Sequence, residues 1–353
     1  MSSRHENTPS FSPPIDEMRA IIRGLYLGLL AREPDAGGLA NWIAIWQGGA
    51  NLGVIAEALI LSEEYKSKRP SATSQISGES AAIEALPGML RSSPVVIVDV
   101  GAQILSSEDH VYAGLIDQKV PTRVIGFEPL EHRRVERLES EGPGLTLLPA
   151  FVGDGKEHVF HTNEPDSTSS LLPFNQVVTS RLLELAPLRT VATEPVMTST
   201  LDEALKEEAY VDLLKLDIQG FELEALRHAN EILRRTLVVH CEVSFVEIYK
   251  GQALFSEIEQ YMRTKGFELV DFPTLCHYPI ANTPYNESRD WLGWGDAVFF
   301  RRLEDNANWR EALVQSLIAF VVYGKSSLAS SLAQGLENTP AAGFMDYLLK
   351  GAK

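Results

Sequence analysis

The sequence predicts an α/β fold with a Rossmann-like sheet of seven strands, mostly parallel, over residues 81–304. Apolar runs of strand length alternate with helical or loop segments, a pattern typical of parallel sheets that helices cover on both faces. The last run follows no long helix, so we expect it to enter antiparallel, beside the run before it. The seven runs are residues 94–100, 122–128, 145–152, 211–217, 236–243, 266–272 and 296–301.

Two helical segments flank this predicted sheet. Apolar residues at helical spacing from Met18 to Leu30 indicate a first helix, and Leu39 to Trp46 and Leu52 to about Tyr65 indicate two more. We therefore expect a small, separable helical module over residues 14–67. From their composition, we expect residues 1–13 to be disordered and residues 68–80, rich in Ser, Thr and Pro, to form a linker. Residues 305–353 are expected to form a helical extension.

Charge and composition restrict the partners and the setting. The net charge of −17 over 353 residues argues against nucleic acid or an anionic membrane as the main partner, because both need Lys and Arg. The longest apolar run is far shorter than the ~20 residues that span a bilayer. The N-terminus is polar, and the two cysteines, Cys241 and Cys276, are expected to be reduced. These features predict a cytoplasmic protein without a membrane span.

The first predicted strand ends in Asp99-Val-Gly101-Ala102-Gln103. A glycine here lets the backbone turn tightly beside a ligand, and a following helix offers free N–H groups to a carboxylate. The third glycine of a dinucleotide fingerprint is missing, and Leu105 stands where glycine is common, which weakens an NAD interpretation. An ordinary strand-to-helix turn remains the alternative.

The next two strand ends add acids. Glu128 follows the second strand, where it could accept hydrogen bonds from both hydroxyls of a ribose. Gly153 and Asp154 follow the third, where Val152 could flank an adenine and Asp154 could accept from its amino group; a Gly-Asp-Gly turn before a strand at 158–162 explains them equally well. With Asp99, these acids have the layout of an S-adenosylmethionine pocket.

Charged residues also occur where two central strands should be apolar. Lys215 and Asp217 share one face of their strand, and His240 and Glu242 share one face of theirs. Buried charge is costly unless it is paired, so the cluster predicts a catalytic site. His240 is the first candidate base, because its unperturbed pKa suits neutral pH, with Asp217 and Glu242 orienting it or the acceptor.

Two alternatives to this catalytic interpretation stay open. One is structural: a Lys215–Glu242 ion pair, with Asp217 capping a helix that starts at Ile218. The other is Mg²⁺ held by Asp217 and Glu242, although we predict no resident metal. His161 and His277 are further candidate bases.

A long segment before the last strand carries several aromatic residues. Loops of this length are often lids or substrate walls, although ordinary packing explains any one of these side chains better. The residues are His277, Tyr278, Tyr285, Trp291 and Trp294.

Taken together, these motifs resemble the FkbM family of S-adenosylmethionine-dependent O-methyltransferases from about Val95 to Arg302. The resemblance implies methyl transfer from S-adenosylmethionine to a hydroxyl of a sugar, a glycan or a small metabolite. It is carried by Asp-Val-Gly-Ala at 99–102, Gly-Phe-Glu-Pro at 126–129, Ser-Thr-Ser-Ser-Leu-Leu at 167–172, Ser-Thr-Leu-Asp at 199–202, Leu-Lys-Leu-Asp-Ile-Gln-Gly-Phe-Glu at 214–222 and Glu-Val-Ser-Phe at 242–245.

Residues 24–65 carry Leu25-Tyr-Leu-Gly-Leu-Leu-Ala-Arg32-Glu-Pro-Asp35 and then Gly38-Leu-Ala-Asn-Trp42. They separately resemble a helical module of unknown role that occurs on bacterial cell-surface and glycan-related proteins. The resemblance implies a docking or assembly part, and we expect any protein docking through 14–67 or 305–353. An alternative function is therefore a non-catalytic, cofactor-binding or scaffold protein, which the altered turn at Gln103 and Leu105 would favour.

Overall fold

The computed structural model describes residues 15–30, 32–47, 55, 59, 90–103, 110–140, 144–303, 308–336, 339 and 341–343. The chain divides into two compact units, residues 1–78 and 79–353. Among the described residues, no helix is both long enough and apolar enough to cross a membrane. The cysteines Cys241 and Cys276 are free thiols.

The first unit contains the helices α1 (Ile15–Leu30) and α2 (Ala36–Gln47). Their apolar stripes form a small core, to which Ile55 and Leu59 also belong. Asp35 accepts a hydrogen bond from the Gly38 N–H at 2.8 Å, at the start of α2. The predicted third helix lies outside the described residues except for Ile55 and Leu59, and so do the segments 1–13 and 68–80.

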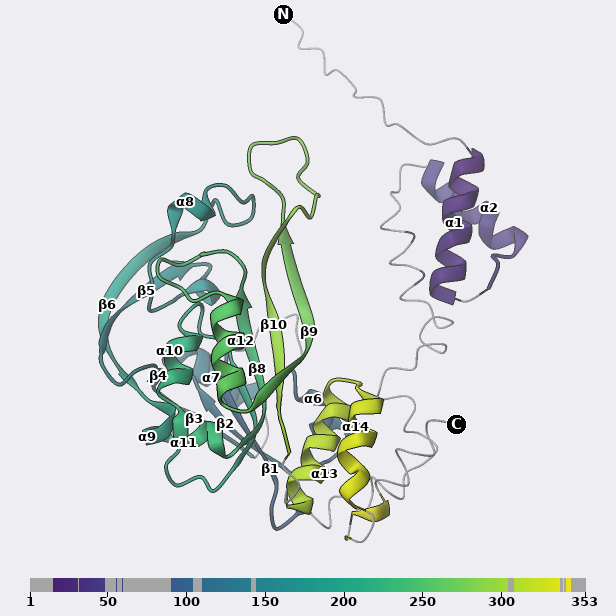
Figure 1. Cartoon of the computed structure of the whole chain (residues 1–353). Coiled ribbons are helices and arrows are strands. Elements are labelled where there is room, and N and C mark those ends of the chain that lie inside the picture. The colour runs from purple at the N-terminus through teal and green to yellow at the C-terminus, as the bar shows by residue number, and fades with distance from the viewer. Residues whose placement is uncertain are drawn as a thin grey trace, which may run out of the picture. The chain divides into compact units, whose positions relative to one another are not determined.

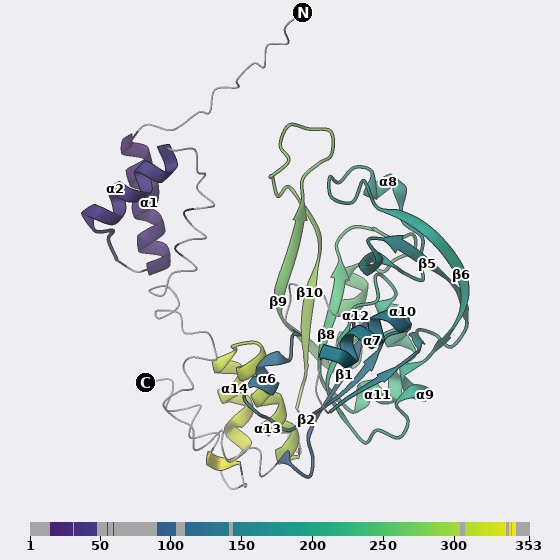
Figure 2. The ribbon, with the colours of Figure 1, turned by 180° about the vertical axis from the view of Figure 1, so that it is seen from behind.

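The second unit is built on a seven-stranded sheet with the order β3-β2-β1-β7-β8-β10-β9 (Figures 1 and 2). β3, β2, β1, β7 and β8 pair in parallel, whereas β10 is antiparallel to both β8 and β9. The predicted Rossmann-like sheet with an antiparallel last strand is therefore confirmed, and β10 is inserted between two earlier strands. The strands are β1 (Val95–Val100), β2 (Thr122–Phe127), β3 (Leu145–Leu148), β7 (Val211–Leu216), β8 (Thr236–Ser244), β9 (Phe267–Tyr278) and β10 (Trp291–Arg301).

Helices cover both faces of this sheet. One face packs on α9 (Leu201–Ala204), α10 (Glu222–Arg227), α11 (Asn230–Arg234) and α12 (Phe255–Thr264), in a core that includes Val98, Leu214 and Cys241. On the other side of the sheet, α13 (Trp309–Leu317) packs on β7 and β8 (Figures 1 and 2). The remaining helices are α6 (Ala113–Asp117), α7 (Glu131–Ser140), α8 (Gln176–Thr179), a π-helix (Ile318–Val322), α14 (Ser326–Leu332) and 3-10 helices at Asp166–Thr168 and Ala333–Leu336.

The predicted single strand over 145–152 is wrong. The chain forms β3 up to Leu148 and then, after Pro149, β4 (Phe151–Val152), which belongs to a second sheet of three strands in the order β4-β6-β5. In that sheet β5 (Glu157–Glu164) pairs antiparallel with β6 (Arg189–Ser199). β6 went unpredicted because it is mostly exposed and polar, so it has no apolar run.

Only part of the aromatic segment before the last strand is the long loop that the sequence predicts, since Tyr285 lies in a loop at 279–290. His277 and Tyr278 belong to β9, and Trp291 and Trp294 belong to β10. These two strands form a long hairpin, drawn in bright green in Figure 1, in which Tyr278 pairs with Trp291. Tyr278 and Trp294 pack in an apolar cluster with Phe174 and Tyr249, residues distant in sequence, so hydropathy alone does not reveal this pairing.

Candidate functional site

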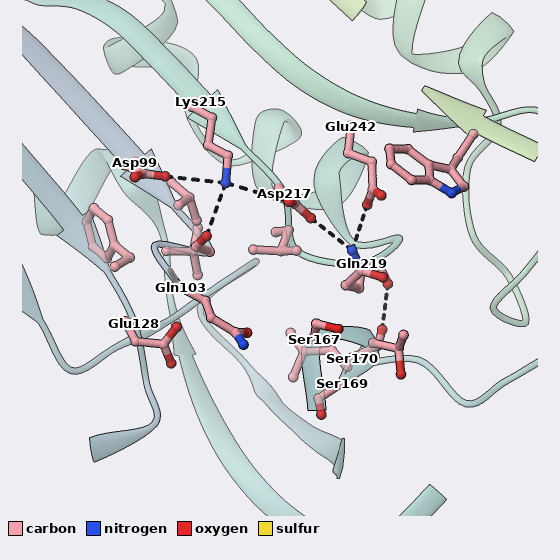
Figure 3. Close-up of a pocket in the computed structure, with 18 of the residues that line it drawn as sticks. Asp99, Gln103, Glu128, Ser167, Ser169, Ser170, Lys215, Asp217, Gln219 and Glu242 are labelled. Carbon is pink, nitrogen blue, oxygen red and sulfur yellow. Dashed lines mark hydrogen bonds and ion pairs between the residues drawn. The ribbon is translucent and has the colours of Figure 1, made fainter. Parts of the chain in front are cut away.

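A cavity of about 740 Å³ lies at the carboxyl ends of the parallel strands. This is the edge where ligands bind in open α/β sheets, and the volume is ordinary for a small-molecule site. Of the predicted site residues, Asp99, Gly101, Gln103, Glu128, Asp217, His240 and Glu242 line it. Figure 3 shows Glu128 and Gln103 together at one end, with Gln219 and Glu242 at the other.

Gly101 forms the turn where β1 meets the end of β7. Its φ is +76°, and a Cβ there would lie 1.8 Å from the carbonyl oxygen of Asp217. Only glycine fits such a position. The neighbouring Ala102 is buried, and its N–H donates to the Phe127 carbonyl at 3.1 Å. This packing brings the β1, β2 and β7 strand ends to one edge of the cavity.

Asp99 is buried and paired inside the protein. Its Oδ2 lies 2.9 Å from both Arg137 Nη1 and the Tyr112 hydroxyl, and its Oδ1 lies 3.4 Å from Lys215 Nζ. Burial alone would raise the pKa of Asp99, but the charges of Lys215 and Arg137 and the Tyr112 hydrogen bond hold that pKa below its usual value. Direct contact between Asp99 and a cofactor stays a prediction.

Glu128 has a carboxyl group that is only partly used by the protein. It is buried, and its Oε1 accepts from the Leu130 N–H at 2.7 Å. Burial raises the pKa of Glu128, and that N–H and nearby arginines only partly offset it. Among the described residues, no donor lies within hydrogen-bond distance of the second carboxyl oxygen, Oε2. This oxygen is therefore suited to accept hydrogen bonds from the hydroxyl groups of a ligand.

Gln103 lies beside Glu128 in the cavity (Figure 3). With its amide oxygen facing Arg133, Gln103 accepts from Nε at 3.2 Å and from Nη2 at 3.1 Å. Arg133 also pairs with Asp166, which precedes the Ser167–Ser170 segment. Gln103 therefore joins the end of β1 to this segment, whose residues also line the cavity. The predicted turn residue Leu105 lies outside the described residues.

Gly153 and Asp154 do not line the cavity. The Asp154 carboxylate is bound by Lys156 and by His158, whose Nε2 lies 2.7 Å from Oδ1. Burial would raise the pKa of Asp154, but the hydrogen bonds from these two residues lower it well below its usual value. A role for Asp154 at an adenine therefore stays a prediction, and its present contacts stabilise the turn before β5.

Lys215 links the two ends of the cavity. Its Nζ lies 3.4 Å from Asp99 Oδ1, 3.6 Å from Asp217 Oδ2 and 3.1 Å from the carbonyl oxygen of Gly101. Burial would lower the pKa of Lys215, but the negative charges of Asp99 and Asp217 outweigh this effect and raise the pKa above its usual value. The predicted alternative of a Lys215–Glu242 ion pair is wrong, because the register sets Lys215 beside His240, and Asp99 on the neighbouring strand is within reach.

Asp217 also does not cap a helix at Ile218, as the structural alternative supposed. Helix α10 begins only at Glu222, whose Oε1 accepts from the N–H groups of Ile218 and Gly220 at 2.9 and 3.1 Å. In the turn between Asp217 and helix α10, Gln219 and Gly220 have φ values of 55° and 100°. This left-handed turn leaves Asp217 facing the cavity with about a third of its side chain exposed.

His240 is buried between two side chains that the sequence did not connect with it. Its Nδ1 lies 3.2 Å from the hydroxyl of Tyr323, and its Nε2 lies 3.5 Å from Asp296 Oδ1. Burial would raise the pKa of Asp296, but hydrogen bonding to His240 lowers it overall. Both ring nitrogens therefore face the protein, and the role of His240 as a base stays a prediction.

Glu242 and Asp217 are joined by Gln219. The amide nitrogen of Gln219 lies 2.9 Å from Asp217 Oδ1 and 3.0 Å from Glu242 Oε2 (Figure 3). Burial raises the pKa of Glu242 well above its usual value, and the negative charges of Asp217, Glu222 and Asp296 raise it further. Because both carboxyl groups accept from one amide, ionisation of both at once is unfavourable.

Several cavity residues escaped the sequence-based prediction. Gln219 lies in the quoted Leu-Lys-Leu-Asp-Ile-Gln-Gly motif, so a polar residue before a turn glycine was the available signal. Tyr249 and Asp296 come from segments whose pairing is long-range. Among the described residues, no group of three or more His, Cys, Asp or Glu side chains has the arrangement of a metal site.

Residues 99–269 match the family model described as the methyltransferase FkbM domain. No curated protein matches the chain.

Three solved structures that resemble the chain are methyltransferases or bind the methyl donor. A SAM-dependent methyltransferase from Anabaena variabilis is 9% identical, with 67% of this chain and 94% of that one covered and a TM-score of 0.31. Sp1610 from Streptococcus pneumoniae, solved with S-adenosyl-L-methionine, is 13% identical, with coverages of 76% and 93% and a TM-score of 0.31. The 23S rRNA methyltransferase ErmE is 9% identical, with coverages of 69% and 76% and a TM-score of 0.28.

The cavity has features that fit S-adenosylmethionine. They are the buried Glu128 carboxyl group, the tight turn at Gly101 and the Ser167–Ser170 segment, all of which line it. The chain therefore contains an FkbM methyltransferase domain, and its methyl donor is S-adenosylmethionine.

Proposed function

We propose that this protein transfers a methyl group from S-adenosylmethionine to a hydroxyl of a neutral, polyhydroxylated acceptor, such as a sugar, a glycan or a small metabolite. The observation that carries the proposal is the pairing of carboxyl groups with aromatic rings at the end of the cavity away from Glu128. There, Asp217, Glu242 and Asp296 line the same cavity as Tyr249, Tyr278 and Trp294.

The aromatic residues in this region are held by contacts with neighbouring side chains. Trp294 Nε1 donates to the Tyr278 hydroxyl at 2.8 Å, and Tyr249 stacks on Phe174 with ring centroids 5.1 Å apart. Rigid aromatic faces suit the apolar C–H face of a sugar ring, whereas carboxyl groups accept hydrogen bonds from its hydroxyls. This combination supports a sugar-like acceptor.

The charges in the cavity disfavour a polyanionic acceptor such as RNA. Among the lining residues that the structure describes, Lys215 is the only lysine or arginine, and it is paired with Asp99 and Asp217. Phosphate recognition depends on available cationic side chains. The net charge of −17 supports the same conclusion.

When bound, S-adenosylmethionine supplies a methyl group already activated for transfer. The protein has to bind it, exclude water, hold the acceptor oxygen in line and take up a proton. Glu128 and the Ser167–Ser170 segment would hold the cofactor, and Lys215 keeps Asp99 and Asp217 in place at the junction.

For the proton, we assign Asp217 as the base. It has exposed surface in the cavity, whereas both ring nitrogens of His240 already have protein partners. Glu242, whose pKa is raised, would stay neutral and position the acceptor by a hydrogen bond. His240 would then support Asp296 and Tyr323 without touching the reacting atoms.

The test is an assay with S-adenosylmethionine labelled in its methyl group. The acceptors are methyl glycosides of hexoses and deoxyhexoses, nucleotide-sugars and a short RNA. We expect label in the neutral glycosides and none in RNA. Label found only in RNA would contradict the acceptor class, and binding of S-adenosylhomocysteine without transfer to any hydroxyl, including those of an extract from the source cells, would support a non-catalytic protein.

A further inference from the structure

Gln219 is a polar cavity residue with an unusual backbone conformation and several side-chain contacts. It adopts a φ of 55°, a left-handed conformation that is uncommon for a residue with a side chain. Strain of this kind persists only where surrounding contacts compensate for it. Gly220, which also has a left-handed φ, completes the turn and packs against Gln252 and Tyr249.

The contacts of Gln219 join four segments of the chain. Its amide nitrogen donates to Asp217 after β7 and to Glu242 in β8, at 2.9 and 3.0 Å. Its amide oxygen lies 2.8 Å from the Tyr249 hydroxyl. Its carbonyl oxygen accepts from Ser170 Oγ at 2.7 Å (Figure 3).

The chemistry of this bridge is specific to an amide. One NH₂ group carries two protons, so it can donate to two carboxyl groups at once, while its oxygen accepts from a third partner. A Glu at this position would present only oxygens to Asp217 and Glu242, and a Met of similar size would present no donor. A mere space-filling role would tolerate Met better than Glu.

The charges around this bridge increase its importance. The groups near it are Lys215 beside Asp217, Glu222 under the turn, and Asp296, which acts electrostatically on Glu242 from β10. Two carboxyl groups facing one cavity repel each other whenever both are ionised. A shared donor between them offsets that repulsion and fixes their separation.

We propose that Gln219 is a positioning residue that holds Asp217 and Glu242 in the arrangement needed to bind and deprotonate the acceptor. The proposal rests on the proposed function, in which Asp217 takes the proton. It assigns no chemical step to Gln219 itself. Misplacing a reacting group by about 1 Å can cost on the order of a hundredfold in rate, so the effect of losing the bridge is measurable.

The first test does not depend on activity. The side-chain amide signal of Gln219 is assigned by NMR from its loss in Gln219→Met. If the bridge exists, Asp217→Asn and Glu242→Gln each shift this signal, whereas the control Asp117→Asn, on the exposed end of α6, leaves it unchanged. A signal that responds to neither substitution would overturn the bridge.

The second test separates positioning from structure. We expect Gln219→Met to lower kcat by about 10- to 100-fold, with the affinity for S-adenosylhomocysteine within about twofold, and Gln219→Glu to be at least as impaired. The control Gln176→Met, at an exposed site on α8, should match the wild type. Gln219→Gly relieves the left-handed strain, so it should keep its melting temperature better than Gln219→Met while losing the same turnover.

These tests distinguish the two proposals. An amide signal that responds to both carboxyl substitutions, in a protein that methylates nothing, would preserve the bridge and reject the methyl transfer. Methyl transfer that is unchanged per folded molecule in Gln219→Met would preserve the function and reject the role of Gln219.

Discussion

Lys215 Nζ lies 3.4 Å from Asp99 Oδ1, which joins the ends of β7 and β1 beneath the cavity. Lys215 is also 3.6 Å from Asp217, so one ammonium group serves acids at both ends of the site. Asp99 itself is almost fully buried and shares Arg137 as a second cationic partner. Removing one partner of a buried pair leaves an uncompensated charge, which is strongly destabilising.

The first prediction follows from this pair. Lys215→Met should lower the free energy of unfolding by about 1–3 kcal/mol, less than the loss of a sole partner because Arg137 remains. Asp99→Asn should destabilise the protein in either background, because it removes the carboxylate that pairs with the buried Arg137. Denaturant unfolding of the single and double variants measures the coupling between Lys215 and Asp99. Strictly additive effects would show that the two side chains are not coupled.

The second prediction concerns the cofactor. Glu128→Ala should weaken binding of S-adenosylhomocysteine by about 1–3 kcal/mol, the scale of hydrogen bonds to a charged group. Glu131→Ala, an exposed acid at the start of α7, is the matched control and should bind normally. Titration calorimetry measures both. Equal affinities in the two variants would place the ribose elsewhere.

The third prediction is a pH dependence. Burial raises the pKa of Glu222 to about 7, an effect that its hydrogen bonds from backbone N–H groups only partly oppose and that Asp217 increases. The folded state therefore binds this proton more tightly than the unfolded state does, and its contribution is fully present below the unfolded pKa of about 4.3. Stability is then lost as the pH rises through about 7.

Glu222→Gln tests this dependence, because its amide oxygen can still accept from Ile218 and Gly220. Between pH 5 and 8 the variant should lose less stability than the wild type, by up to roughly 3 kcal/mol for a shift of this size. Glu242 titrates in the same direction and remains in both proteins, so a residual slope is expected. Parallel stability curves would contradict the assignment.

The sequence predicts those features of the fold and the site that depend on residues close together in the chain. The strand-ending acids Asp99 and Glu128 and the charged pair Lys215 and Asp217 are local signals, since apolar runs that end in a charge are visible without a structure. The seven-stranded sheet followed from the same runs.

The side chains that each of these residues contacts could not be predicted from local sequence. The Asp296 and Tyr323 contacts of His240 depend on insertion of β10 beside β8 and on the segment after α13, both set by long-range packing. The left-handed turn at Gln219 also needs tertiary contacts to compensate for its strain. Exposed β6 lacked an apolar pattern altogether.

The fourth prediction concerns His240. If this ring is held by Asp296 and Tyr323 and does not take the proton, His240→Ala should lower the melting temperature yet reduce turnover per folded molecule by less than about tenfold, below the usual range for a general base. Tyr323→Phe should produce a smaller effect in the same direction, because only one hydrogen bond is lost. A hundredfold loss in folded His240→Ala would return the role of base to His240.

The most direct test of the account is methyl transfer by Asp217→Asn, measured with labelled S-adenosylmethionine and a neutral glycoside acceptor and expressed per folded molecule. Asn keeps the size of Asp217 and can still contact Gln219 but cannot accept a proton. The account predicts that turnover falls by about a hundredfold or more, while S-adenosylhomocysteine binds as it does to the wild type. Wild-type turnover in this variant would contradict the account.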